Sequence, residues 1–231
     1  MLEATAMAIS STTGFDPAVH GFHFKNRFSG LDIVGAFNVG LGNVADIVSE
    51  NAGFWKGWGL CGGMSWMALD RFYAGDAMPA ATQIPEASAD LFSELVERQI
   101  DSFLGVSLIT RCLNWQSRAE NNRWWDPRNT TWKLTMQHWP AVKASIDHGY
   151  PASLTLIRTQ VNPSDNHQVL GIGYCEDSAG MGRIDLYDPN HPNETPTIIL
   201  RLDGPQAGRA VQSSGERLRG FFVWPYLEQE P

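Results

Sequence analysis

The sequence predicts an α+β fold, with helices in the first half of the chain and an antiparallel β-sheet in the second. Two observations carry this prediction. Between about residues 41 and 149, apolar residues recur mainly at the three- and four-residue intervals typical of helices. Between about residues 150 and 226, short apolar runs are bounded by Gly, Pro, Asn and Asp, which is the pattern of antiparallel strands.

The length and composition predict one domain. The chain has 231 residues, of which 43% are hydrophobic and 18% charged, as is typical of a globular protein with a sizeable core. We therefore expect a single domain over residues 1–231, with residues 1–20 flexible. The formal net charge of -8, without a long run of either sign, argues against nucleic acid as a partner.

The apolar segments and the cysteine spacing also limit where the protein can be located and which cofactors it can bind. No segment has the roughly 20 consecutive apolar residues that a membrane span needs, and residues 1–20 lack the basic start and apolar run of a secretory signal. The three cysteines are too widely spaced to predict a disulfide framework or a CxxC metal site. We expect a cytoplasmic protein without a cofactor or a membrane partner, and the oligomeric state stays open.

The first elements follow from spacing and from glycines. Residues 21–40, "GFHFKNRFSGLDIVGAFNVG", alternate and then become apolar, which predicts extended structure interrupted by glycines. Helical spacing begins near Met64 and should stop near Gly75 and Pro79. Apolar residues over 91–104 continue the helical period in a second segment, which is expected to run on towards Cys112 and Trp115.

The later elements are shorter. Residues 114–132 are rich in Asn, Arg and Trp without any period, which predicts a long surface excursion. Residues 139–151, "WPAVKASIDHGYP", predict a short helix with Pro140 in its first turn and Gly149 at its end. Five runs then predict strands, at 152–158, 167–174, 183–188, 197–202 and 220–225.

Cys61 is the candidate nucleophile. It lies in "GWGLCGG", where a glycine-rich approach meets the start of a predicted helix. The free N–H groups and the positive end of the dipole at a helix N-terminus stabilise a thiolate. Gly62 and Gly63 would let a substrate backbone approach closely. Cys112 and Cys175 have no such setting, and we interpret them as structural thiols.

A nucleophilic cysteine needs a base. His167 opens the predicted strand "HQVLGIGY". A side chain at the start of a strand can face a cleft while the backbone behind it is fixed. The other histidines lie in the first extended segment, beside a predicted helix or in a loop. His167 is therefore the candidate base, which would take the proton of the Cys61 thiol and return it during the reaction.

Four segments resemble the papain-like cysteine peptidase superfamily, particularly its compact bacterial members similar to the bacteriocin-processing peptidases. They are "GLCGGMSWMALDRF", "IDHGYPASLTLI", "NHQVLGIGY" and "IDLYDPNHP", which make up about a fifth of the chain and are spread over residues 59–192. The resemblance implies a central helix that starts at the nucleophile Cys61 and packs on the sheet. It also implies a histidine at 167 and a third triad member from the Asp-Pro pair at 188–189.

The third triad member has two candidates, Asp188 and Asn190. If Tyr174 pairs with Arg183, Asn190 lies opposite His167 and Asp188 is its diagonal neighbour on the same face. We favour Asp188 because it ends the regular strand ahead of a proline. A carboxylate also stabilises an imidazolium better than an amide does.

The oxyanion site departs from the family. Papain-like enzymes usually carry a glutamine a few residues before the nucleophile, but "NAGFWKGWGLC" has none. The backbone N–H of Cys61 supplies one donor. Candidates for a second donor or for the cleft wall are Asn51, Trp55, Trp58 and Asn166.

Several functions stay open. The first is a cysteine hydrolase that acts on a peptide-like or acyl substrate, and a thiol acyltransferase similar to transglutaminases is its close alternative. A second is a non-catalytic binding module with Trp124, Trp125 and Trp132 as its contact surface. A third is a metal hydrolase that uses His167, Asp188, His191 and Glu194, although these residues lack the spacing of HExxH.

Overall fold

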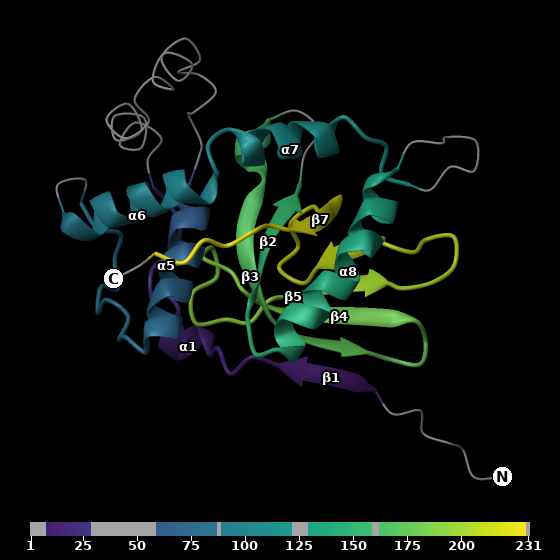
Figure 1. Ribbon diagram of the computed structural model, residues 1–231, viewed down its shortest axis with the longest axis horizontal. Coiled ribbons are helices and arrows are strands. Elements are labelled where there is room, and N and C mark those ends of the chain that lie inside the picture. Colours follow the sequence, from purple (N-terminus) through teal and green to yellow (C-terminus); the bar gives the residue numbers. More distant parts are fainter. Residues whose placement is uncertain (1–7, 29–58, 87–88, 122–128, 159–161, 230–231) are drawn as a thin grey trace.

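The computed structural model describes residues 8–28, 59–86, 89–121, 129–158 and 162–229 (Figure 1). Within this part the chain combines helices with an antiparallel sheet, which confirms the mixed composition predicted from the sequence. The helices are α1 (Pro17–His20), α5 (Cys61–Ala74), α6 (Asp90–Ser102), α7 (Ser107–Gln116) and α8 (Thr131–Asp147). A short 3-10 helix, η2 (Pro163–Asp165), precedes the strand that carries His167.

The strands form one sheet in the order β6-β5-β4-β3-β2-β7, and β1 pairs with the end of β3. Every pairing is antiparallel. The strands are β1 (Ile9–Thr12), β2 (Ala152–Ile157), β3 (His167–Glu176), β4 (Met181–Tyr187), β5 (Thr197–Arg201), β6 (Ala210–Gln212) and β7 (Gly220–Val223). The strand β3 is thus central and pairs with β1, β2 and β4.

The helix α5 runs beside β3 and is buried over its first nine residues (Figure 1). It begins at Cys61, without a side-chain cap on Leu60, and it ends at Gly75 as expected. Gly75 adopts φ 72°, a left-handed conformation that closes the helix and that glycine adopts without strain. The predicted start of the helical spacing near Met64 was therefore one turn late.

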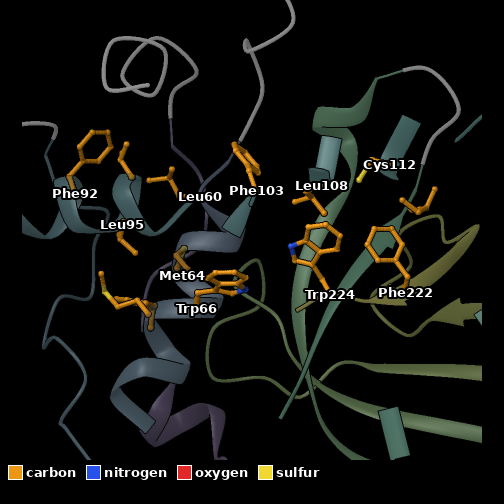
Figure 2. Close-up of a cluster of buried hydrophobic side chains, with 14 of the residues drawn as sticks. Leu60, Met64, Trp66, Phe92, Leu95, Phe103, Leu108, Cys112, Phe222 and Trp224 are labelled. Atoms are coloured by element: carbon orange, nitrogen blue, oxygen red, sulfur yellow. The ribbon is translucent and has the colours of Figure 1, made fainter. Parts of the chain in front are cut away.

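Two hydrophobic cores hold helices on the sheet. One joins α5 and α6 to α7 and the end of β7, and Figure 2 shows Met64 and Trp66 of α5 among its members together with Phe222 and Trp224. The other lies between α8 and the sheet and contains Trp139 and Val142. A third, smaller cluster packs α5 against β3 and β4. Since α5 contributes residues to the first and the third of these clusters, packing fixes its position relative to β3.

The outer end of the β3–β4 hairpin differs from the prediction by one residue. Tyr174 pairs with Ile184, whereas the predicted partner was Arg183. The turn is shorter than expected, because the Asp177 side chain accepts a hydrogen bond from the Met181 N–H at 2.9 Å and β4 begins there. The pairing at this end was therefore predicted wrongly.

A β-bulge restores the predicted register nearer the site. The pairing shifts between Gly171 and Gly173, so that Ile172 is the extra residue, and Leu170 pairs with Tyr187. Continued by three residues, this register places residue 190 opposite residue 167, as the sequence analysis expected. The bulge thus shifts the pairing by one residue, and the part of the hairpin near the site has the predicted register although the outer end does not.

The helical half differs from the prediction at two points. The second helix does not run on to Trp115, because the chain turns at Leu104 and Gly105, both with positive φ, and separates α6 from α7. The helix α8 begins at Thr131 rather than at Trp139, so the surface excursion is shorter than expected. Pro140 lies inside α8 on its exposed side, and packing of the opposite face on the sheet outweighs the lost backbone hydrogen bond.

The chain ends hold elements that the pattern did not predict. Residues 9–20 contain β1 and α1, which the pattern did not predict, and residues 1–7 lie outside the described residues. The strand β6 was not predicted. Residues 21–28 form neither helix nor strand, and the rest of the predicted extended segment lies outside the described residues. No described helix is both long and apolar enough to cross a membrane.

Replacing Gly63 with alanine is expected to destabilise the protein. A Cβ atom at Gly63 would lie 2.1 Å from the Leu95 carbonyl oxygen, so α5 and α6 would have to separate. We expect the free energy of unfolding to fall by about 1–3 kcal/mol, which urea denaturation followed by circular dichroism measures. A stability within about 0.5 kcal/mol of the unchanged protein would contradict the close approach of the two helices.

Candidate active site

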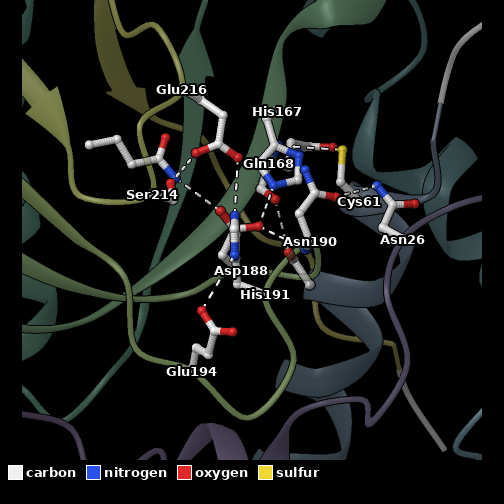
Figure 3. A network of polar contacts seen from close by, with 12 residues as sticks. Asn26, Cys61, His167, Gln168, Asp188, Asn190, His191, Glu194, Ser214 and Glu216 are labelled. Carbon is white, nitrogen blue, oxygen red and sulfur yellow. Dashed lines mark hydrogen bonds and ion pairs between the residues drawn. The ribbon is translucent and has the colours of Figure 1, made fainter.

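His167 and Asp188 form a buried pair. His167 Nε2 lies 2.6 Å from Asp188 Oδ1, and the two side chains are 4% and 0% exposed (Figure 3). The register explains the contact. Val169 of β3 and Leu186 of β4 point into the same core. Because side chains alternate along a strand, His167, two residues before Val169, and Asp188, two residues after Leu186, lie on that same face of the sheet. Asp188 is therefore the predicted candidate that the structure brings to His167.

Cys61 completes the group. Its thiol forms a hydrogen bond with His167, and since Nε2 of the ring is taken by Asp188, Nδ1 is the nitrogen left for sulfur. The Gln168 backbone N–H donates a second hydrogen bond to Cys61 Sγ at 3.4 Å. The start of α5 and the start of β3 thus meet at the sulfur atom.

Asp188 is held by two further donors. The Asn190 N–H donates to Oδ1 at 2.8 Å, and Gln212 Nε2 donates to Oδ2 at 3.0 Å. Asn190, the alternative third member, therefore contacts Asp188 through its backbone. Both carboxylate oxygens are satisfied, which fixes the orientation of the group that orients His167.

Arg158 lies behind this pair. It donates from Nη2 to Gln212 Oε1 at 3.2 Å, and the same atom is 3.8 Å from Glu216 Oε1. Its positive charge lowers the pKa of both Asp188 and Cys61. Arg158 therefore favours the negatively charged form of two groups at the site.

The pKa values of the pair move apart. Burial lowers the pKa of His167, but the negative charges of Asp188 and Cys61 outweigh it and raise the pKa to about 9. Burial raises the pKa of Asp188, but the His167 charge and the hydrogen bonds outweigh it and lower the pKa to about 2. At neutral pH the pair is therefore an imidazolium beside a carboxylate.

The pKa values of the two buried cysteines, Cys61 of α5 and Cys112 of α7, also shift in opposite directions. Burial raises the pKa of the Cys61 thiol, but the His167 charge and the hydrogen bonds from His167 and Gln168 outweigh it, so the pKa lies below its ordinary value. Burial raises the pKa of Cys112 to about 12. The neighbours of Cys61 thus favour its thiolate form, while burial favours the neutral thiol of Cys112.

Three of the predicted cleft residues have other surroundings. A Cβ atom at Gly62 would lie 1.9 Å from Gln168 Oε1, and the space beside Gly63 is filled by α6. Protein atoms thus occupy the space that a side chain at either glycine would take, and close approach of a substrate backbone stays a prediction. Asn166 accepts a hydrogen bond from the Arg158 N–H at 3.1 Å, which braces the loop before His167.

Several predicted residues lie outside the described residues. These are Asn51, Trp55 and Trp58, the candidate oxyanion donors, and Trp124 and Trp125 of the proposed contact surface. Trp132, the third member of that surface, is half-buried in the first turn of α8.

The metal alternative is not supported by the geometry of its residues. His191 Nε2 lies 3.1 Å from Glu216 Oε1, and Nδ1 lies 3.6 Å from Glu194 Oε2 (Figure 3). His167 and Asp188 bond to each other instead of converging with them. Within the described ranges, no three His, Cys, Asp or Glu side chains are grouped so that they could hold a metal ion.

Sequence reasoning missed three polar residues of the site: Asn26, Arg158 and Gln212. Gln212 lies on the unpredicted strand β6, and Asn26 lies in a segment without regular structure, so no periodic pattern marked either. Arg158 follows β2 directly, and a charged residue at the end of an apolar strand was the one available signal.

Cys61 is expected to be the fastest thiol to react with iodoacetamide. At pH 7 its lowered pKa should make it at least about tenfold faster than Cys112, although both are buried. Limited alkylation followed by peptide mapping measures the ratio, and His167→Ala should remove the advantage. Preferential labelling of Cys112, or of the more exposed Cys175, would contradict the assignment.

We compared the chain with protein-family models, curated proteins and solved structures, and none of the three comparisons gave a match. The chemistry of the site therefore has to be inferred from its own geometry.

Proposed function

We propose that the protein is a cysteine hydrolase that cleaves a peptide-like amide or an acyl ester through an acyl-thioester intermediate. The observation that carries the proposal is the connected series Cys61, His167 and Asp188, in which the carboxylate lies 2.6 Å from the ring and the ring contacts the thiol. A nucleophile, a base and a group that orients the base are the parts that this chemistry needs.

The first half of the reaction follows from the charges at the site. The Cys61 thiolate attacks the carbonyl carbon, and a carbon–sulfur bond forms as the carbonyl oxygen becomes negative. The His167 imidazolium then donates its proton to the leaving amine or alcohol, and the bond to the leaving group breaks. Asp188 stabilises the imidazolium before this step and keeps Nδ1 facing the sulfur.

The second half returns the site to its starting form. His167, now neutral, takes a proton from a water molecule, and the resulting hydroxide attacks the thioester carbonyl. The carbon–sulfur bond breaks, the acid leaves, and Cys61 is again a thiolate beside an imidazolium. If an amine replaces the water, the same steps give acyl transfer, so the acceptor alone separates the hydrolase from the acyltransferase alternative.

We also propose that the fold is papain-like. In support, the nucleophile opens a buried helix, and the base opens a strand of the antiparallel sheet packed against that helix. A cytoplasmic location is part of the same proposal, and it is supported by three cysteines that are all unpaired.

Substitutions should separate the roles of the site residues. Cys61→Ala should abolish turnover of a panel of fluorogenic peptide amides and p-nitrophenyl esters. Asp188→Asn should lower kcat/KM by about 10²- to 10⁴-fold, because an amide stabilises the imidazolium poorly. Asn190→Ala should cost less than Asp188→Asn, since Asn190 reaches Asp188 through its backbone N–H and the substitution removes only the side-chain acceptor of Asn26 Nδ2.

Thermal unfolding of each variant is the control for these measurements. Cys61→Ala should melt close to the unchanged protein. Turnover by Cys61→Ala, or a larger loss in Asn190→Ala than in Asp188→Asn, would contradict the proposed roles.

The pH dependence of kcat/KM should be bell-shaped. Activity should rise as the Cys61 thiol loses its proton, below the ordinary thiol pKa of 9.0. It should fall as pH increases through about 9, where the His167 imidazolium loses the proton that the leaving group needs. Initial rates between pH 4 and 11 on an ester substrate test this, and a curve that rises through pH 9 without a later fall would contradict the ion pair.

A further inference from the structure

Asn26 connects the turn before the nucleophile with the loop after Asp188. Its side-chain Oδ1 accepts a hydrogen bond from the Leu60 N–H at 2.8 Å, and its backbone N–H donates to the Pro189 carbonyl at 2.9 Å. Its Nδ2 donates to Asn190 Oδ1 at 3.3 Å. These three bonds fix both the position of Asn26 and the orientation of its amide.

The amide lies directly against the turn that leads into Cys61. A Cβ atom at Gly59 would lie 2.5 Å from Asn26 Nδ2, so the absence of a side chain at Gly59 makes room for this group. Figure 3 shows Asn26 beside Cys61, with His167 on the other side of the thiol. Asn26 is half-buried, so it borders the site without being sealed inside it.

Asn26 keeps one hydrogen for another acceptor. A carboxamide nitrogen carries two hydrogens, and the bond to Asn190 uses one of them. The first turn of α5 offers a second donor. The Leu60 N–H donates to Asn26 and the Gly63 N–H donates to Gln99, whereas the Cys61 N–H donates to no acceptor among the described residues.

We propose that Asn26 Nδ2 and the Cys61 backbone N–H together stabilise the oxyanion that forms when the thiolate attacks a carbonyl group. This inference rests on the proposed hydrolase function. It assigns to Asn26, which comes 35 positions before Cys61, the donor role for which the sequence holds no nearby glutamine. Asn26 is thereby a catalytic residue that contacts the substrate oxygen.

The step that Asn26 assists is acylation. The thiolate forms a bond to the carbonyl carbon, and the electron pair of the carbonyl π bond moves to oxygen. When that pair returns, the bond to the leaving group breaks and the leaving group takes the electrons. Donors that are already oriented stabilise the oxygen at the moment it becomes charged, and the three bonds of Asn26 provide that orientation.

A comparison of two reactions of Cys61 tests the proposal. Iodoacetamide alkylates the thiolate without forming an oxyanion, whereas p-nitrophenyl acetate acylates it through one. We expect Asn26→Ala to lower the acylation rate, followed as the burst of p-nitrophenolate, by about 10- to 100-fold. The alkylation rate of Cys61 should stay within about twofold, because the thiolate keeps His167 and the Gln168 N–H.

Two further variants complete the design. Asn26→Asp retains the acceptor for the Leu60 N–H but has no N–H donor, so it should lose acylation while it melts near the unchanged protein. Asn114→Ala, at an exposed position on α7, is the matched control and should change neither rate.

The alkylation and acylation rates together distinguish a failure of the oxyanion role of Asn26 from a failure of the hydrolase function. If Asn26→Ala and Asn26→Asp lose alkylation and acylation in parallel, Asn26 only braces the turn, and the oxyanion role is wrong. If neither rate changes, the role is also wrong. If Cys61 of the unchanged protein is alkylated but never acylated, the hydrolase proposal itself fails, and that result is seen without any variant.

Discussion

A single extra residue in β3 determines whether the site can form. The hairpin turn sets the outer end of the β3–β4 pairing at Tyr174 and Ile184. If that register continued unbroken, residue 188 would lie on the opposite face of the sheet from residue 167. The bulge at Ile172 shifts the pairing by one, so the two side chains share a face and meet at 2.6 Å. The bulge therefore directs the Asp188 carboxylate toward His167.

Burial makes this geometry costly unless every charge has a partner. Asp188 is fully buried, and it is compensated by His167, by two N–H donors and by the nearby charge of Arg158. An ionised carboxylate without such partners would take up a proton or destabilise the fold. The residues around Asp188 therefore do two things at once: they keep it ionised, and they hold its oxygens at fixed positions.

The sequence predicted what depends on local pattern and failed where distant contacts decide. The helical spacing after Cys61 and the apolar runs of β2 to β5 and β7 predicted those elements, and residue order selected Cys61, His167 and Asp188. The break at Leu104, the true start of α8 and the short strand β6 depend on tertiary packing. Asn26 and Gln212 are placed by contacts 34 and 24 residues away in the chain, to Leu60 and to Asp188, which no periodic pattern records.

The pairing of Gln212 with Asp188 has a consequence for the order of events in folding. The thiol comes from residue 61, while the groups that charge it and orient its partner extend to residue 212. During synthesis, at roughly 5–20 residues per second, Cys61 leaves the ribosome about 150 residues before Gln212. Until β6 docks at the edge of the sheet, Asp188 lacks the Gln212 donor that holds its second carboxylate oxygen. The environment that lowers the pKa of Cys61 and orients His167 is therefore complete only in the finished fold.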